Sequence, residues 1–481
     1  MYSIHTMSQL RRKMTFRLYP SPQEEAILLG WLELHRQIYN AALEERMDAW
    51  RKKRIHLSYF DQQNALLALE KDLPETDVLG SHALQETLRR LDRAFQAFYR
   101  RCAKGQTPGF PRFKGKKRFD SFCFPDPAGW SITSRGYEEK DGSKGAKYKN
   151  KRSHTLRVGA LSIQARGMCR FDAYVPNDLT IKRLAEGVWE ACVTLRVDKK
   201  DCKRERAGNL IRGFDQGLED RMVFDDGEEI ANPRWLHEEL DNLALLQQSR
   251  ARCQKRSCRH KKLNRQIARL HRAIANKRKD WLHKLSTELV ASCEIICTEE
   301  LTVRNMSRAP TPKPELDEQG KETGRYLPNG AAAKAGLNRE LLSAGLGMLL
   351  RIGESKAAEA GTLWHVAKTR QIKPTQRCAC CGTIIKKHLD ERMHICLSCG
   401  FITTRDRNAA LVCLVDGLCP GYWAAIDKKK PASMGSYGVL IKNRILYAAQ
   451  TVATDSGTAH GTGVVTEIVK SDLCDSLETP A

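Results

Sequence analysis

The segment RCACCGTIIKKHLDERMHICLSCGFITTRDRNAALVCL, residues 377–414, holds two CxxC pairs separated by 14 residues. The cysteines of the two pairs are Cys378, Cys381, Cys396 and Cys399. Two such pairs supply four thiolates, which is the ligand set of a closed tetrahedral zinc site. We therefore predict a ribbon over residues 375–402 that binds a structural Zn²⁺ ion. Cys380 is interpreted as a neighbour that is not a ligand.

Three acidic residues stand at predicted strand ends or at a predicted helix start. Asp406 follows the last cysteine by seven positions and lies in the first turn of a predicted helix. Asp215 ends an apolar strand that begins near residue 209, and Glu299 follows the apolar run 293–298. Three carboxylates that converge can hold two Mg²⁺ ions about 4 Å apart, the arrangement that hydrolyses phosphodiesters. Their distance in the sequence permits this convergence without showing it, so three separate surface carboxylates remain the alternative.

The charge of the chain favours a polyanionic partner. Its 81 Lys and Arg residues exceed its 57 Asp and Glu residues, which gives a net charge of +24. A nucleic acid is the commonest such partner, and an anionic membrane surface is the rival. No apolar run approaches 18 residues, so we expect no membrane span. The 17 cysteines, many of them single in apolar segments, suit a reducing cytoplasm rather than a disulfide framework.

A second basic feature is the segment GFPRFKGKKRF, residues 109–119, in which aromatic residues alternate with cations. Stacking faces next to cations are typical of surfaces that bind single strands or an RNA backbone. A basic surface loop without this role is the alternative. The residues predicted to contact nucleic acid are Arg112, Lys114, Lys116, Lys117 and Arg118.

Taken together, these motifs resemble the TnpB family of transposon-encoded RNA-guided DNA nucleases, which are related to the compact type V CRISPR effectors. The similarity spans about residues 13–415. The motifs that carry it are FRLYPSPQEE, YNAAL, LQETLRRLDRAFQAFYRR, GFPRFKGKKRFDSFCF, RGFDQGL, IANPRWL, DWLHKLSTELV, TEELTVRNM, LNRELLSAG and the ribbon with DRNAA.

The resemblance implies a multidomain α/β protein with an RNase H-like RuvC nuclease domain into which the zinc ribbon is inserted. A β-barrel-like wedge and helical recognition region for guide RNA and target DNA would precede it. The expected division is 1–205 for that region, 206–374 for the first nuclease part, 375–402 for the ribbon, 403–419 for the last nuclease helix and 420–481 for a basic, mostly disordered tail. Within the nuclease part we expect a helical hairpin over 233–290 and a flexible insertion over 308–335. Another hydrophilic insertion is expected over 134–155.

The same resemblance implies an activity and its partners. The chain would be a metal-dependent endodeoxyribonuclease that pairs a guide RNA with target DNA and recognises a short flanking motif. Its partners would be guide RNA, double-stranded DNA and the RNA–DNA heteroduplex, in a monomeric cytoplasmic ribonucleoprotein that acts at the nucleoid. The catalytic and magnesium-binding residues would be Asp215, Glu299 and Asp406.

Two positions depart from the family pattern, and two alternative functions stay open. Gln216 stands where the family usually has an apolar residue, and Thr404 where it commonly has an aspartate. Neither change removes a predicted ligand. The alternatives are a compact type V CRISPR effector and a DNA-binding transposase or regulator that acts without cleavage.

Overall fold

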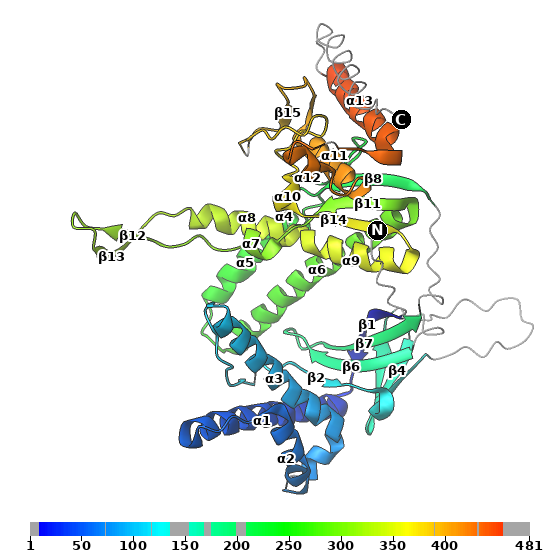
Figure 1. Ribbon diagram of the computed structural model, residues 1–481. Helices are drawn as coiled ribbons and strands as arrows, with labels where there is room; N and C mark the ends of the chain where they lie inside the picture. The colour runs from blue at the N-terminus through cyan, green and yellow to red at the C-terminus, as the bar shows by residue number, and fades with distance from the viewer. Residues whose placement is uncertain are drawn as a thin grey trace, which may run out of the picture. The chain divides into compact units, whose positions relative to one another are not determined.

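The protein was analysed as a computed structural model, which describes residues 9–72, 74–116, 118–134, 153–167, 175–198, 208–388, 390–430 and 432–455. Its contacts divide the chain into two compact units (Figure 1). The first unit comprises residues 1–202 and 253–268, and the second comprises residues 203–252 and 269–481. Each unit has its own sheet and its own apolar core.

The first unit contains a seven-stranded antiparallel half-barrel sheet in the order β2-β6-β7-β1-β5-β4-β3. The central strand β1 pairs with β7 on one side and with β5 on the other. Strands such as β5 alternate buried and exposed residues, as a sheet with one covered face requires. The strands are β1 (Gln9–Tyr19), β2 (Ser121–Phe124), β3 (Trp130–Ser134), β4 (Ser153–Val158), β5 (Leu161–Arg166), β6 (Val175–Arg183) and β7 (Trp189–Asp198).

The helices of this unit complete the core on the sheet's covered face. They are α1 (Pro22–Lys53), α2 (Tyr59–Asp72) and α3 (Ser81–Ala103). Ser21 and Glu24 form a capping box at the start of α1, with proline as the first helical residue. Apolar residues of α1 and α3 and of the strands belong to one buried cluster. The helices are therefore fixed to the sheet by shared apolar burial.

The second unit is built on a five-stranded mixed sheet in the order β10-β9-β8-β11-β14. Strands β8, β11 and β14 are parallel, whereas β9 and β10 run antiparallel. Helices α6 and α9 cover one face and α11 covers the other, through separate apolar clusters. The strands are β8 (Leu210–Asp215), β9 (Asp220–Phe224), β10 (Glu229–Ala231), β11 (Cys293–Glu299) and β14 (Leu363–Ala367).

The connections between these strands are mostly helical. Between β10 and β11 come α4 (Trp235–Glu238), α5 (Leu240–Ala251) and α6 (Cys258–Ser292), which occupy the range expected for a helical hairpin. Between β11 and β14 come α7 (Val303–Met306), α8 (Ala331–Ala344) and α9 (Leu346–Ala360), and α10 (Thr369–Ile372) follows β14. Gly345, with φ of 68°, separates α8 from α9.

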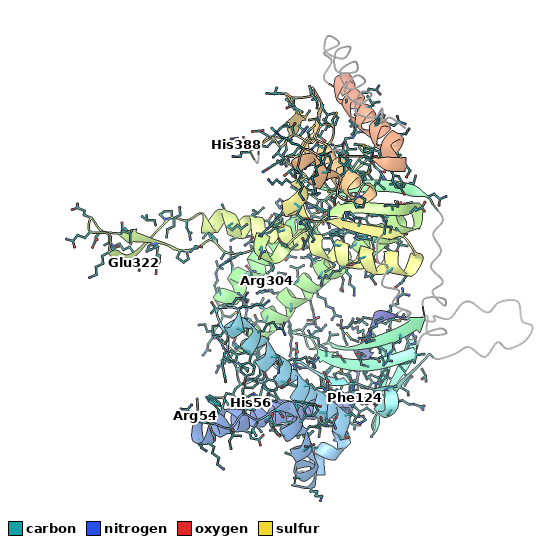
Figure 2. The ribbon with its side chains drawn as sticks, viewed as in Figure 1. Arg54, His56, Phe124, Arg304, Glu322 and His388 are labelled. Atoms are coloured by element: carbon teal, nitrogen blue, oxygen red, sulfur yellow. The ribbon has the colours of Figure 1, made fainter. Side chains whose placement is uncertain are left out.

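The insertion expected to be flexible over 308–335 contains a hairpin of β12 (Lys313–Leu316) and β13 (Glu322–Leu327), where Figure 2 labels Glu322. The carboxylate of Asp317 accepts the N–H groups of Gln319 (3.0 Å) and Lys321 (2.8 Å), and these bonds close the turn. All residues of β13 are exposed, which suits the charged composition of the insertion. Of the other expected insertion, residues 135–152 lie outside the described residues.

The expectation of a mostly disordered tail from residue 420 is wrong for its first part. Two helices form there, α12 (Tyr422–Asp427) and α13 (Gly438–Asp455). Ile441, Ile445 and Ala448 are fully buried in the cluster that also holds α11. Their spacing is that of one helix face, which the surrounding Gly, Ser and Lys residues masked. Residues 456–481 lie outside the described part, and no described helix is long and apolar enough to cross a membrane.

Candidate functional site

Two of the three predicted carboxylates lie next to each other at the ends of neighbouring parallel strands. Asp215 is the last residue of β8, and Glu299 is the last residue of β11. The register pairs Gly213 with Cys297, so continuing it by two residues places Glu299 beside Asp215. Adjacent strands are about 4.8 Å apart. The topology of the sheet, rather than any local motif, therefore brings these two residues together.

Close packing of α11 (Arg405–Leu418) on the sheet brings the third carboxylate to the same place. A Cβ atom on Gly213 would clash with the carbonyl oxygen of Ala410, and one on Gly417 would clash with the sulfur of Cys297. The two glycines thus let the helix approach the strands. The charge of Asp406 acts on Asp215 and raises its pKa, so Asp406 lies near Asp215 at the same end of the sheet.

The carboxyl group of Asp215 is influenced by the charges of both other carboxyl groups. Asp215 and Glu299 are each 7% exposed, and their side chains are hydrogen-bonded to each other. Burial, together with the charges of Glu299 and Asp406, raises the pKa of Asp215 well above its usual value. Burial raises the pKa of Glu299 to about 7. The protein alone therefore does not offset the cost of holding ionised carboxylates at this buried site.

Three further side chains at the start of α11, those of Thr404, Arg407 and Asn408, form hydrogen bonds around Asp406. Thr404 caps the helix, its Oγ1 accepting the N–H of Arg407 at 3.3 Å. Arg407 donates to the main-chain oxygens of Asp225 and Asp226, both at 3.1 Å, and so ties the helix to the turn after β9. Threonine and aspartate both cap helices, so Thr404 supplies locally what the commoner aspartate would supply.

Asn408, two residues after Asp406, links the same helix to the ribbon. Its side chain accepts the N–H of Ala379 at 3.0 Å and donates to the main-chain oxygens of Pro374 (3.2 Å) and Arg377 (2.7 Å). Arg377 is fully buried and forms two hydrogen bonds with Asp427 of α12. The contacts of Arg407 and Asn408 were not predicted from the sequence. Their position in the turn that carries Asp406 was the available signal.

The four predicted cysteines form the one group in the described part of the chain whose donor atoms lie close enough to share a single metal ion. Their four sulfurs all lie within 4.8 Å of one another. The Cys378–Cys399 sulfur distance is 3.7 Å, and the Cys381–Cys396 distance is 3.5 Å. A tetrahedral site with Zn–S bonds of about 2.3 Å has sulfurs roughly 3.8 Å apart, whereas a disulfide needs about 2 Å. The donor set therefore fits zinc, and Cys380 is outside it.

Two matching turns present these sulfurs. In each CxxCG turn the glycine N–H donates to the first cysteine's oxygen, Gly382 to Cys378 at 2.9 Å and Gly400 to Cys396 at 2.8 Å. Both glycines have positive φ, 77° and 69°, so a side chain there would be strained. Strands β15 (Met393–Ile395) and β16 (Ile402–Thr404) join the second turn to α11. Zinc here would hold the ribbon closed.

The segment 109–119, which is predicted to contact nucleic acid, is hydrogen-bonded to α1. Asn40 donates to the main-chain oxygen of Lys114 at 3.0 Å and accepts its N–H at 2.8 Å, and Arg36 donates to the same oxygen at 3.0 Å. Phe119 is buried, so it is a core residue and not a stacking face. The exposed predicted cations are Arg112, Lys116 and Arg118, Lys114 is half-buried, and Lys117 lies outside the described residues.

Comparison with known families matches three parts of the chain. Residues 192–309 match the OrfB family of IS605 elements, described as a probable transposase. Residues 347–413 match a Cas12f1-like TNB domain, and residues 7–54 match a helix-turn-helix domain of OrfB proteins. In the structure the last range contains β1 and the single long helix α1.

Two curated proteins match over most of their length. A "Putative RNA-guided DNA endonuclease" of Streptomyces pristinaespiralis is 29% identical over 86% of this chain and 90% of its own. InsQ of Escherichia coli K12, which carries the same description, is 27% identical over 84% of this chain and 91% of its own. A solved Cas12f1–sgRNA–target DNA complex covers 82% of this chain and 83% of that chain, with 13% identity and a TM-score of 0.44.

The sheet, the carboxylates and the cysteine ribbon define a mixed α/β protein with a candidate metal centre. The family matches and the two relatives support the resemblance that the motifs predicted: parts of the chain match OrfB family models, and most of the chain is similar to proteins described as "Putative RNA-guided DNA endonuclease".

Proposed function

We propose that this chain is an RNA-guided DNA endonuclease of the TnpB type and that Asp215, Glu299 and Asp406 form its catalytic site. The observation that carries the proposal is the meeting of these carboxylates at one end of the second sheet. Full-length relatives described as RNA-guided DNA endonucleases support it. The net charge of +24 suits a protein that holds an RNA and a heteroduplex.

The strand order of the second unit supports a RuvC-like domain of the RNase H fold. In chain order, the antiparallel strands β8, β9 and β10 come first, and β11 and β14, which are parallel to β8, follow them. Asp215 ends β8, the first strand, and Glu299 ends β11, the fourth. A helix after the fifth strand carries the third carboxylate. The ribbon lies between that strand and that helix, as the inserted zinc module of this proposal requires.

The chemistry of the donors fits magnesium. Mg²⁺ prefers hard oxygen ligands and keeps several waters, so a few carboxylates suffice. Two such ions would activate water and stabilise the leaving oxygen of a phosphodiester. They lie about 4 Å apart in such sites, so the three carboxylates need not share a single ion. The chain's own contribution is to hold these oxygens: Gln216 N–H donates to Asp215 at 3.0 Å, and Arg405 Nε donates to Asp406 at 3.2 Å.

A compact CRISPR effector is the second candidate, because residues 347–413 match a Cas12f1-like domain. Its chemistry would be the same, and the source of its RNA would differ. In either case we propose a cytoplasmic ribonucleoprotein that acts on DNA at the nucleoid. A transposase acting without cleavage would need no guide RNA.

The proposal is tested by measuring magnesium-dependent cleavage of a DNA target that matches the co-purified RNA. Asp215→Asn should lower the cleavage rate by about 1,000-fold or more, since several kcal/mol of transition-state stabilisation depend on the metal site. RNA binding should be unchanged. Glu300→Gln is the matched control, because this exposed neighbour of Glu299 is not among the proposed ligands. Wild-type cleavage by the Asp215→Asn variant would remove Asp215 from the site.

A further inference from the structure

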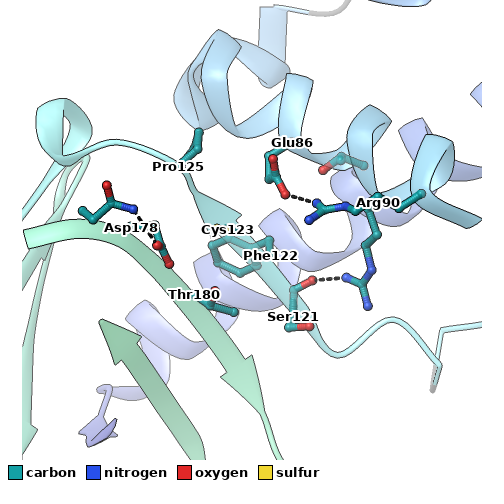
Figure 3. A pocket seen from close by; sticks show the side chains of 11 residues that line it. Glu86, Arg90, Ser121, Phe122, Cys123, Pro125, Asp178 and Thr180 are labelled. Atoms are coloured by element: carbon teal, nitrogen blue, oxygen red, sulfur yellow. Dashed lines mark hydrogen bonds and ion pairs between the residues drawn. The ribbon is translucent and has the colours of Figure 1, made fainter. Parts of the chain in front are cut away.

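The first unit contains two large cavities of different character. One, of about 570 Å³, lies between α3, β2 and β6 and is lined by polar groups (Figure 3). Arg90 donates to the oxygen of Ser121 at 2.8 Å, Arg93 forms an ion pair with Glu86, and Asp178 accepts a hydrogen bond from Thr194 at 3.0 Å. These groups bind one another, so this cavity gives no indication of a ligand.

The other cavity, of about 580 Å³, lies between the C-terminal ends of α1 and α3 and is lined mainly by aromatic rings. The ring of Phe110 packs edge-on against Phe95 and Phe98, with centroids 5.6 and 5.2 Å apart. Trp50 is 53% exposed, Tyr99 41% and Phe110 46%. So much exposed aromatic surface around one hollow is unfavourable in water unless a ligand covers it.

One polar group in the lining lacks a partner. Arg46 is 7% exposed, its Nε donates to Gln62 at 2.8 Å, and its Nη1 pairs with Asp92 at 3.2 Å. Its remaining nitrogen, Nη2, is buried without a hydrogen-bond partner among the described residues. Its guanidinium lies over the ring of Phe95, 5.0 Å from the centroid. Because Asp92 balances the charge of Arg46, the lining suits a neutral ligand.

The end of α1 beside the aromatic cavity is cationic. Four consecutive exposed cations end the helix and its cap, namely Arg51, Lys52, Lys53 and Arg54. Arg51 lines the cavity, and Lys52 forms an ion pair with Asp48 at 2.8 Å. Figure 2 labels Arg54 and His56 at this end of the helix. A planar, uncharged ligand attached to an anionic chain complements both the aromatic lining and the cationic end of α1. A nucleotide has this composition, and bases stack readily on aromatic side chains.

We propose that this cavity binds an unpaired base of the guide RNA, stacked on the exposed rings with its phosphates at the cationic end of α1. The inference rests on the proposed function, which supplies the guide RNA. A folded RNA presents unstacked bases in loops and bulges, where they can stack on aromatic side chains. Phe110 also begins the aromatic and basic segment 109–119, so cavity and loop would contact one RNA.

Arg54 permits a test that does not depend on weakening the fold. Its φ of 55° lies in the left-handed region, at a helix end where glycine is the preferred residue. Its guanidinium lies over the ring of Trp50, 5.6 Å from the centroid. Arg54→Gly should therefore leave the Tm equal or higher, because backbone strain is relieved. If Arg54 serves the RNA, the same variant should bind RNA more weakly.

The experiment measures binding of a 20-nucleotide single-stranded oligoadenylate to the full chain by fluorescence anisotropy. Trp50→Leu and Phe110→Leu should each raise Kd about 10-fold, as loss of one base–aromatic stack predicts. Phe60→Leu is the matched control, since Phe60 is 70% exposed and outside the cavity lining.

The outcomes separate this inference from the function on which it rests. Unchanged Kd in the Trp50, Phe110 and Arg54 variants would overturn the base-binding site even if guided cleavage were intact. A loss confined to oligodeoxyadenylate would overturn the assignment to RNA, and a changed oligomeric state of Trp50→Leu would indicate a second copy of the chain instead. Conversely, normal cleavage by Asp215→Asn would contradict the proposed catalytic site and leave the cavity result unaffected.

Discussion

The cysteine centre and the carboxylate site both draw on the segment 377–414, which holds the four cysteines and Asp406, yet they are assembled differently. The cysteines come from two turns within 22 residues, and each turn is closed by its own hydrogen bonds. The carboxylates come from β8, β11 and α11, which are separated by most of the second unit. The cysteine centre is thus a local device, whereas the carboxylate site exists only when the whole sheet and α11 are in place. Removing a ligand should accordingly have opposite consequences at the two sites.

The largest expected effect on stability is at the cysteine centre. Cys396→Ser removes one of four thiolates, so the chain should lose its zinc and become less stable by several kcal/mol, since metal binding contributes directly to folding. Zinc content and thermal unfolding measure this. Cys380→Ser is the matched control, because Cys380 is outside the ligand set. Full zinc content and an unchanged Tm in Cys396→Ser would contradict the assignment.

At the carboxylate site, removing a charge should stabilise the metal-free chain. The folded pKa of Glu299 is about 7, against an ordinary value of 4.5. Below pH 4.5 Glu299 is protonated in both the folded and the unfolded chain, so it does not change the free energy of unfolding. As the pH rises from 4.5 to 7 the unfolded chain ionises first, so the folded state loses about 3 kcal/mol.

Glu299→Gln should abolish that loss, which is measured as the difference between variant and wild-type unfolding free energies across pH 4.5–7 in a chelator. Magnesium should reduce the difference, because a cation compensates the ionised groups. Glu300→Gln should follow the wild type. A pH-independent difference between Glu299→Gln and wild type would mean that Glu299 is not buried against Asp215.

The junction between α11 and the sheet should be sensitive to a single methyl group. Gly213→Ala places a Cβ against the carbonyl oxygen of Ala410, so the helix must move away from β8. We expect a loss of about 1–3 kcal/mol and slower cleavage, because Asp406 would move from Asp215. Gly336→Ala, at a helical position with open space around it, is the control. Normal cleavage by Gly213→Ala would show that α11 tolerates displacement.

The smallest expected effect concerns the helix cap between the two sites. Thr404→Ala removes the acceptor for the N–H of Arg407 and should cost about 1 kcal/mol. Thr404→Asp should retain wild-type stability, since aspartate caps equally well. Chemical denaturation compares the two variants. Equal destabilisation by both would argue that Thr404 acts through something other than the cap.

The difference between a site built from neighbouring residues and one built from distant strands explains what the sequence could and could not predict. The cysteine set followed from spacing alone, and the sulfurs meet as expected. The carboxylates could be assigned only through resemblance, because strand adjacency is not written in local spacing. The helix α13, which buries Ile441, Ile445 and Ala448, was missed because the segment that precedes it, KKKPASMGSY, is typical of a loop. Arg46 and Trp50 gave no motif: their cavity depends on how α1 and α3 pack.

The central claim is tested most directly by purifying the chain from cells that carry its native flanking DNA, sequencing the co-purified RNA and supplying a matching DNA target with magnesium. Our account predicts a discrete RNA that ends in element-flanking sequence and cleavage that depends on pairing with it. A repeat-bearing RNA would assign the chain to the CRISPR branch instead. Absence of RNA together with direct binding to the element's ends would contradict guided cleavage.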